Sequence, residues 1–465
     1  MKSKFIYFIF LFVIFAIDFF PQTESKLITV IGKELVGRVE NGESIREVRN
    51  DVVLTQGNVV ITCDLAIQYL DQNNAKLIGN VIITQDTLTI TTPEGFYYGN
   101  ERRSFSDKGV KLDDRKIILT AKIGEYFFDE SKAVFENRVK LYDTVSTMTS
   151  DKLIYFRQED RAISTGNVKI VDTANVIYAD SLVHLRNTQT TFAFNNVAIK
   201  NSDNNSIIFG DHLEDHRLKN YSIVDSNPLL IQIDTTKSST DSVTSIDTMI
   251  IKSVIMEAYR DSSNKFIAKD SVKILRDDFA SVNDLTIFYR DVEKIHIYKV
   301  SDSTSTPVMW FENSQLSGDT IIVHLEEKRI KKMDVINNSL VVSQNVDYPS
   351  RYDQITGKDV TLHFDDDGLK RTEVFENVLS IYFLYEETEP NGLIKASSKD
   401  AVIEFSDKKV EKVRLYADPN SEYHPENLVA GKEQVFLLPN FIFYTDKPVK
   451  EQLLLTIKKE FNFTK

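Results

Sequence analysis

The chain has 465 residues, of which 42% are hydrophobic and 11% aromatic, and its net charge is −13 from 56 Lys and Arg against 69 Asp and Glu. An acidic chain without a long basic run lacks the clustered cations that bind phosphate backbones, so we expect no nucleic-acid partner. Only 16 Gly and 10 Pro accompany 29 Phe and 19 Tyr. This composition is typical of an ordered, aromatic-rich β protein.

Residues 1–25 are predicted to be a signal peptide. Lys2 and Lys4 precede an apolar run from Phe5 to Ile17, and a polar stretch follows. This is the layout of a secretory signal, and the run is shorter than the roughly 20 residues that a spanning helix needs. An uncleaved anchor stays open as an alternative. The single cysteine, Cys63, has no intramolecular partner. We therefore expect an exported, periplasmic protein of a bacterial envelope, with outer-membrane association left open.

A strict repeat follows. Valines recur every 29 residues, at Val81, Val110, Val139, Val168 and Val197. An aliphatic residue stands two positions after each of them, as Ile83 does after Val81. A fixed period of this length indicates a repeat architecture, which usually offers an extended surface rather than one catalytic pocket. Short stretches of alternating Val, Ile, Thr and Tyr predict strands.

Two local patterns punctuate each unit. Gly79-Asn80 and its counterparts, such as Gly166-Asn167, are predicted to be turns that lead into a strand, because both residue types tolerate positive φ. A small residue followed by Asp then begins a later strand, as at Ser150-Asp151. Apolar residues follow at +3 and +5 from this Asp. Because alternate residues of a strand share a face, we predict that these side chains point toward the core.

The domain boundaries are predicted from the spacing. A β repeat array is expected over 26–233, a polar Ser/Thr loop or linker over 234–248, and a second, less regular β region over 249–465. Beyond about residue 210 the period loosens, although the Asp pattern recurs at Asp284, Asp319, Asp359 and Asp400. The sequence does not decide whether the last region continues the same array.

The predicted fold class is all-β. Short strands separated by turn patterns favour an elongated antiparallel sandwich, while a parallel β-helix stays open as an alternative. Stacking of neighbouring units buries the apolar face that one unit alone leaves exposed.

The repeated Gly-Asn-Val-x-Ile strand, with its Asp-led partner about ten residues later, resembles the OstA/LptA family. The matching stretches are 56–69, 78–98, 150–156 and 165–185; the resemblance covers about 27–215 well and 280–410 more weakly. It implies a V-shaped β-jellyroll that carries lipopolysaccharide acyl chains in a hydrophobic trough and bridges the periplasm. It also implies partners among the lipopolysaccharide-transport proteins, joined through edge strands such as the one around 27–39, and head-to-tail self-association.

The candidate residues for a lipid-lining wall share inward positions in the predicted strands. They are Ile67, Tyr69, Val81, Ile83, Phe96, Tyr98, Ile154 and Phe156. The alternative for each is an ordinary core position. No cofactor and no metal are expected. His212 and His216 and the run 365–368 are interpreted as loop and turn residues, because their spacing fits neither a zinc nor a calcium motif.

We expect no enzyme, since neither a phosphate loop nor a nucleophile elbow is present. The favoured function is a lipopolysaccharide-binding transport bridge for outer-membrane assembly. A structural or adhesive β-solenoid without a lipid ligand is the alternative, and a polysaccharide-acting enzyme on a parallel β-helix is a third.

Overall fold

The structure of the protein is a computed structural model that describes residues 27–202, 205–237, 244–301, 303–366, 368–406 and 409–455. The predicted signal peptide lies outside these residues. The chain divides into two compact units. The first contains Met1–Lys108 with Phe127–Asp129, and the second contains Gly109–Tyr126 with Glu130–Lys465.

The described residues form 34 strands, and the strand pairs have antiparallel register, as in β3 with β4 and β27 with β28. The prediction of an antiparallel all-β protein is confirmed, and the parallel β-helix alternative is wrong. The first strands are β1 (Thr29–Ile31), β2 (Glu34–Glu40), β3 (Glu43–Gln56), β4 (Val59–Tyr69), β5 (Asn74–Gln85), β6 (Leu88–Tyr98), β7 (Arg103–Ser106), β8 (Val110–Asp113), β9 (Ile118–Ala121), β10 (Ile123–Phe127), β11 (Lys132–Tyr142), β12 (Thr147–Phe156), β13 (Arg161–Val171), β14 (Asn175–Leu185), β15 (Thr190–Asn201), β16 (Ser206–His216) and β17 (Tyr221–Asp225).

The later strands are β18 (Leu229–Lys237), β19 (Thr244–Lys252), β20 (Ile255–Tyr259), β21 (Lys265–Leu275), β22 (Phe279–Tyr289), β23 (Lys294–Tyr298), β24 (Val308–Phe311), β25 (Ser314–Ser317), β26 (Thr320–Glu326), β27 (Arg329–Gln344), β28 (Tyr352–Asp365), β29 (Gly368–Phe375), β30 (Val378–Glu386), β31 (Glu389–Ser398), β32 (Asp400–Ser406), β33 (Lys409–Tyr416) and β34 (Asn420–His424). The helices are short: η1 (Arg217–Lys219), η2 (Arg290–Val292), α1 (Glu426–Val429), η3 (Glu433–Phe436) and α2 (Lys450–Leu454). Across the described ranges, no helix is both long enough and apolar enough to cross a membrane.

Many of the longer strands bend in the middle, so their two halves pair with different neighbours. In β16, the half 206–209 pairs with β18 and the half 212–216 pairs with β17. In β28, the half 354–356 pairs with β30 and the half 359–365 with β29. The halves therefore form two layers within each unit. We name layer A the one that contains 81–85 in the first unit and 168–171 in the second, and layer B the one that contains 94–98 and 152–156.

The bend is built from the residue pairs that the sequence suggested were turns. Gly166 (φ +76°) and Asn167 (φ +47°) lie inside β13, where the ladder with β12 shifts register. The Asn167 amide donates to the Asp151 carboxylate at 2.8 Å. The prediction that Gly166-Asn167 is a turn between strands is wrong. Two successive left-handed residues instead bend one continuous strand, and the Asp-led pattern of the neighbouring strand is its hydrogen-bond partner.

The same bend recurs in the first unit. Gly79 (φ +77°) and Asn80 (φ +46°) lie inside β5, and the Asn80 amide donates to the Asp64 carboxylate at 2.9 Å. A Cβ at Gly79 would lie 2.3 Å from Asp64 Oδ2. Glycine is therefore required at this position both by its φ and by the close approach of the carboxylate.

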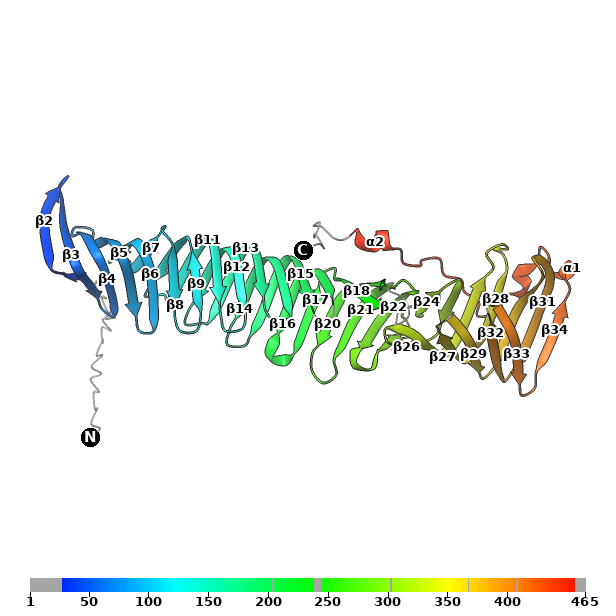
Figure 1. The fold of residues 1–465 in the computed structure, drawn as a ribbon. Coiled ribbons are helices and arrows are strands. Elements are labelled where there is room, and N and C mark those ends of the chain that lie inside the picture. The colour runs from blue at the N-terminus through cyan, green and yellow to red at the C-terminus, as the bar shows by residue number, and fades with distance from the viewer. Residues whose placement is uncertain are drawn as a thin grey trace, which may run out of the picture. The chain divides into compact units, whose positions relative to one another are not determined.

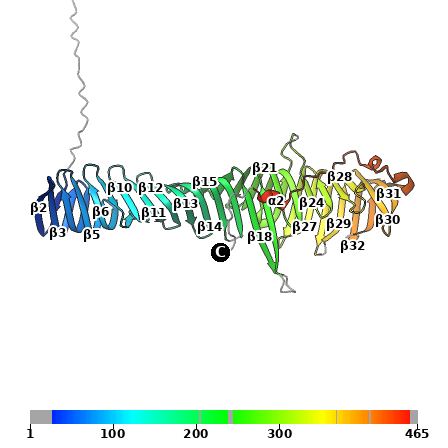
Figure 2. The ribbon, with the colours of Figure 1, turned by 90° about the horizontal axis from the view of Figure 1, so that it is seen from above.

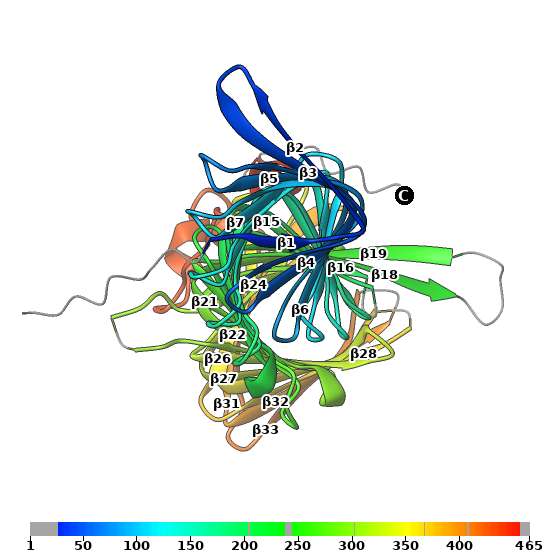
Figure 3. The same cartoon turned by 90° about the vertical axis from the view of Figure 1, so that its left-hand side faces the viewer.

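Strands also occupy most of the segment that was predicted to be a linker. Residues 234–237 belong to β18 and residues 244–248 to β19, and these strands pair with each other. Their hairpin extends beyond the neighbouring strands, as Figure 3 shows. The polar composition of this stretch is explained by an extended hairpin rather than by a break in the sheet.

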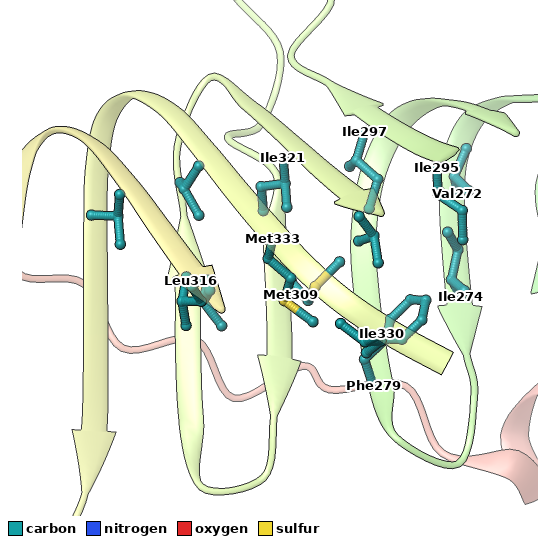
Figure 4. Close-up of a cluster of buried hydrophobic side chains, with 14 of the residues drawn as sticks. Val272, Ile274, Phe279, Ile295, Ile297, Met309, Leu316, Ile321, Ile330 and Met333 are labelled. Atoms are coloured by element: carbon teal, nitrogen blue, oxygen red, sulfur yellow. The ribbon is translucent and has the colours of Figure 1, made fainter. Parts of the chain in front are cut away.

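A large part of the interior of the second unit is one apolar cluster between the two layers. It runs from Leu230 to Ala401 and is drawn in Figure 4. Layer A contributes Met309 and Leu316, and layer B contributes Ile297, Ile321 and Met333; all five are fully buried. Close packing of such side chains is the main favourable contribution to folding.

A third layer is added in the second unit by residues 426–455, which we name the C-terminal strap. The strap starts at α1 and runs back along the strands to α2 (Figures 1 and 2). It covers the outer face of layer A, the face opposite to the interior. Leu438 packs with Val342 and Ile381, and Leu453 packs with Ile250. The covered positions form one register-continuous row: Ile231, Ile250, Leu275, Ala280, Trp310, Gln315, Val342, Gln354 and Ile381.

Candidate functional site: the apolar interior and its seam

The candidate wall residues do not share one face. In the first unit, Val81 and Ile83 are buried in layer A. In layer B, by contrast, Phe96 and Tyr98 are half-exposed, whereas Tyr97 between them is fully buried. Ile67 and Tyr69 are likewise half-exposed and alternate with the buried Ala66 and Gln68.

The same offset occurs in the second unit. Ile154 and Phe156 are half-exposed, while Leu153 and Tyr155 are buried. The prediction that positions +3 and +5 after the Asp point to the core is therefore wrong for these strands. The bend at the Asp changes the alternation by one residue, and a shift of one residue moves every side chain to the other face. The pattern does hold at β28, where Leu362 is buried in the interior cluster.

The outward side chains form an amphipathic surface on layer B. The guanidinium of Arg103 lies 4.1 Å from the ring centroid of Tyr98, and that of Arg161 lies 4.1 Å from the centroid of Phe156. Such cation–π contacts contribute about 0.5–1 kcal/mol at exposed sites. Half-exposure of these rings is thus explained by partners on the surface of the protein.

A polar seam closes the interior where the free ends of the two layers meet. In the first unit, the Tyr97 hydroxyl of layer B donates to Oε1 of Gln56 in layer A at 2.5 Å, and the Gln56 amide donates to the carbonyl of Gly99 at 2.9 Å. Arg102 adds a hydrogen bond to the Gln56 carbonyl at 3.0 Å and an ion pair with Asp129 at 2.7 Å.

The seam has the same construction in the second unit. The Tyr155 hydroxyl donates to Oδ2 of Asp114 at 2.9 Å. The other oxygen of Asp114 accepts from the backbone N–H groups of Lys116 and Ile117, which fixes the turn between β8 and β9. Lys116 then reaches across to Asp160 at 2.9 Å. In both units, the free ends of layer A and layer B are therefore joined by a buried hydrogen bond and by a more exposed polar contact.

The seam residues repeat with the 29-residue period of the valines, a signal that the sequence reasoning missed. Tyr97, Tyr126, Tyr155 and His184 are spaced by 29, as are Gln56, Gln85, Asp114 and Asp143. The signal was available, because the row of tyrosines has the same spacing as the row of amides and carboxylates. Two of these pairs are formed, Tyr97 with Gln56 and Tyr155 with Asp114. At the fourth position the tyrosine is replaced by His184, and Asp143 is one of the charges that act on it.

Burial controls the protonation of this row. It raises the pKa of Tyr97 to about 12 and also raises the pKa of Tyr155, with a further contribution from the Asp114 charge. Burial lowers the pKa of His184 below 6.5, because the charged imidazolium is disfavoured away from water. The tyrosines are therefore neutral donors and His184 is a neutral imidazole at pH 7.

The N-terminal strands present an open edge. Both β1 and β2 pair with β3. All seven residues of β2 are exposed, including Leu35, Val36 and Val39. An exposed apolar strand is a template for pairing with another chain. The strand also carries Glu34, Arg38 and Glu40, and Arg38 forms ion pairs with Glu40 and with Glu47 of β3.

The histidine pair lies in a strand, so the interpretation of these two residues as loop residues is wrong. His212 and His216 both lie in β16, where four residues separate them by about 13 Å at the usual rise of a strand. His212 contacts Asp225 at 2.9 Å, and His216 contacts Glu214 at 3.4 Å. In the part of the chain that is described, no group of three His, Cys, Asp or Glu side chains is placed to hold a metal ion.

The bent strands, the two layers and the closed apolar interior define a repeat array of the antiparallel β-jellyroll type. Residues 25–120 match the family model described as OstA-like protein. The resemblance to this family that was predicted from the sequence is confirmed over these residues.

Several solved structures match the chain as well. One of them is described as the crystal structure of LptH, the LptA homologous periplasmic component of the conserved lipopolysaccharide transport device from Pseudomonas aeruginosa. Its sequence identity is 17% and its TM-score is 0.18; the similarity covers 32% of this chain and 98% of that chain. No curated protein matches the sequence.

Proposed function

We propose that the protein binds lipopolysaccharide or a related glycolipid in its apolar interior and acts as a periplasmic bridge in outer-membrane assembly. The observation that carries this proposal is the interior itself, an apolar cluster that continues through many successive strands of one unit. The OstA-like match of residues 25–120 supports the same role. The proposed role needs binding only and no covalent chemistry.

The proposed binding is driven by burial of acyl chains. Each CH₂ removed from water contributes about 0.8 kcal/mol, so part of several chains is enough for stable binding. The proposed wall consists of inward residues such as Val81 and Ile83 in the first unit and Phe135 and Leu153 in the second. The outward residues Ile67, Tyr69, Phe96, Tyr98, Ile154 and Phe156 are not part of this revised wall.

In this proposal, lipid enters by opening the seam. The interior side chains are close-packed, so the layers must separate before a chain can lie between them. A hydrogen bond to a charged carboxylate contributes about 1.5–3 kcal/mol net, so breaking the bond between Tyr155 and Asp114 costs about as much as the burial of two to four methylenes recovers. The array is thus expected to take up lipid one repeat at a time.

We propose that partners join the array through its N-terminal edge. The exposed strand β2 and the preceding residues from Leu27 would pair with a lipopolysaccharide-transport protein or, head to tail, with a second copy. Successive N–H groups of a strand point to opposite edges, so either Leu35→Pro or Val36→Pro removes a donor from the outer edge. One of the two variants should weaken complex formation in a pull-down while the monomer stays folded; unchanged complexes with both would refute edge pairing.

Photo-crosslinking tests where the lipid lies. A benzophenone amino acid is placed at Phe135, which is fully buried between the layers, or at Phe156, which is half-exposed on the outer face of layer B. Full-length protein with lipopolysaccharide should crosslink from position 135 and not from position 156. Crosslinking from position 156 alone would place the lipid on the outer surface and reject the interior site.

The structural alternative has one observation in its favour, since the interior is filled by the protein's own side chains. Absence of crosslinks from both positions, together with lipid-free protein in mass spectrometry of material purified from cells, would support a structural envelope role instead.

A further inference from the structure

The C-terminal strap lies on a surface that recognises polypeptide backbone. The Gln315 side-chain amide donates to the carbonyl of Tyr444 at 2.5 Å, and its oxygen accepts from the N–H of the same residue at 2.9 Å. Two layer A strands farther along, Oε1 of Gln354 accepts from the N–H of Leu438 at 2.8 Å. Gln315 and Gln354 are only 4% and 3% exposed. These buried glutamine amides supply the strap with hydrogen bonds that a neighbouring strand would otherwise give to its backbone.

Apolar side chains of the strap occupy specific places on the same surface. Phe441 and Phe443 both lie against Tyr352, with ring centroids 5.2 and 5.0 Å apart. Leu453 of α2 is buried against Ile250 and its neighbours. Exposed Ile442 lies between the two phenylalanines, so this stretch alternates like a strand although it pairs with none. The surface therefore selects side chains at alternate positions of an extended segment.

An ion pair fixes the start of the strap. The Arg351 guanidinium, whose side chain is 4% exposed, binds Glu426 in a fork at 2.5 and 3.2 Å, and Glu433 lies 3.6 Å away. Glu426 also accepts from the N–H of Gly392 at 2.9 Å. A bidentate ion pair with arginine fixes the geometry of the carboxylate and also stabilises the contact. The pair therefore selects one orientation of the bound segment.

The strap is nevertheless separable from the array. Within the described residues, the backbone–backbone hydrogen bonds of 426–455 join residues of this segment, or its preceding Pro425, to one another. The strands beneath it are held by continuous ladders, such as that of β27 with β28. Elements held only by side chains open at lower free energy than the sheet on which they lie. The strap also follows the last strand, β34, so it can leave without unthreading any strand.

We propose that the outer face of layer A in the second unit is a peptide-binding groove, that the strap is its bound ligand, and that the strap of a second copy can take the same place. The ligand class is an extended segment with an acidic residue at its start and apolar residues at the spacing of Leu438, Phe441 and Phe443. Exchange of an identical terminal element between copies would produce a dimer. This inference does not depend on lipid binding.

The groove is tested in the full chain with a protease site inserted at the exposed residues 430–432. After cleavage, residues 433–455, which keep Glu433 within 3.6 Å of Arg351, should stay bound in gel filtration, and a labelled synthetic peptide of residues 432–455 should replace them in a saturable way. Gln315→Leu with Gln354→Leu should weaken peptide binding by about tenfold or more, because buried backbone groups of the strap lose their partners. Gln158→Leu, at an exposed position, is the matched control.

Three results would overturn the proposal. A cleaved strap that leaves at once, with no peptide binding at about 100 µM, would show that the face is not a groove. Loss of the β signal in circular dichroism on cleavage, or a strap that never exchanges before the array unfolds, would make the strap part of the core. The second-copy step is tested with two differently tagged intact chains, which should form mixed dimers that excess peptide disperses. Peptide exchange without mixed dimers would overturn that step.

Discussion

Two regions of the second unit, 130–197 and 198–455, both have a buried apolar interior but differ on the outer face of layer A. The register partners on this face, which include the row from Ile231 to Ile381, form what we name the outer row. In the first region, Val171 belongs to the outer row and is 39% exposed. In the second, Ile250 occupies the same row at 2% exposure because the strap covers it. The row is continuous in register through Val176, Lys200 and Ile207. The first region therefore has two layers, and the second region has the strap as a third layer.

The difference explains why the sequence loses its regular period. Val197 is the last valine of the 29-residue series, and the next residue, Ala198, is the first in the cluster that packs against Leu453 of the strap. Strands that are covered on both faces read as continuous apolar runs, as in Leu229-Leu230-Ile231, rather than as alternating ones. Side chains on the outer face must then match the strap as well as their neighbours in the repeat.

The largest effect is expected in the buried interior, which each of the two regions has. Phe135→Ala in the first region and Phe266→Ala in the second each remove a fully buried ring. Each should lower the free energy of unfolding by about 3–5 kcal/mol in urea denaturation. Phe156→Ala, which removes a half-exposed ring from the outer face of layer B, should cost much less. An equal loss for all three would contradict the assignment of inward and outward faces.

The outer row should separate the two regions. Ile250→Ala leaves a cavity beneath α2 and should cost about 2–4 kcal/mol. Val171→Ala, in the same row but exposed, should stay within about 0.5 kcal/mol of the parent protein. Similar losses for the two variants in urea denaturation would mean that the strap does not bury the row and would remove the distinction between the regions.

The fold class followed from the sequence because alternation, low Gly and Pro content and the valine period all indicate antiparallel strands. The face on which Ile154 and Phe156 lie could not be predicted in the same way. The prediction counted alternate positions from Asp151, and such a count does not show that the neighbouring strand bends at two left-handed residues. The strap was also missed. Residues 437–443 have the composition of a strand, yet the backbone groups of Leu438 and of the following Tyr444 bond to glutamine side chains. Such partners are not visible in a local pattern.

The bends that are common to both regions can be tested with glycine variants. Gly166 has φ +76°, and a Cβ there would lie 2.5 Å from Asp151 Oδ2. Gly109 has φ +99° with open space around its Cβ position. Gly166→Ala should cost about 1–3 kcal/mol and more than Gly109→Ala, which bears only the backbone strain of a positive φ. Thermal unfolding of the two variants provides the measurement. Equal losses would show that the carboxylate moves away freely and does not fix the bend.

The smallest effect is a pH dependence at the end of the two-layered region, where His184 takes the seam position of the tyrosines. Burial lowers the pKa of His184 in the folded protein below 6.5, so the unfolded chain binds more protons as the pH falls through 6.5. This contribution to stability is therefore present above pH 6.5 and is lost on acidification toward the folded pKa. His184→Gln should remove this part of the pH dependence of urea unfolding between pH 7 and pH 5, while Tyr155→Phe should leave its slope unchanged, because the tyrosine stays neutral throughout. If the slope persists in His184→Gln, the acid sensitivity of the region comes from other groups and the seam is not weakened by protonation at this position.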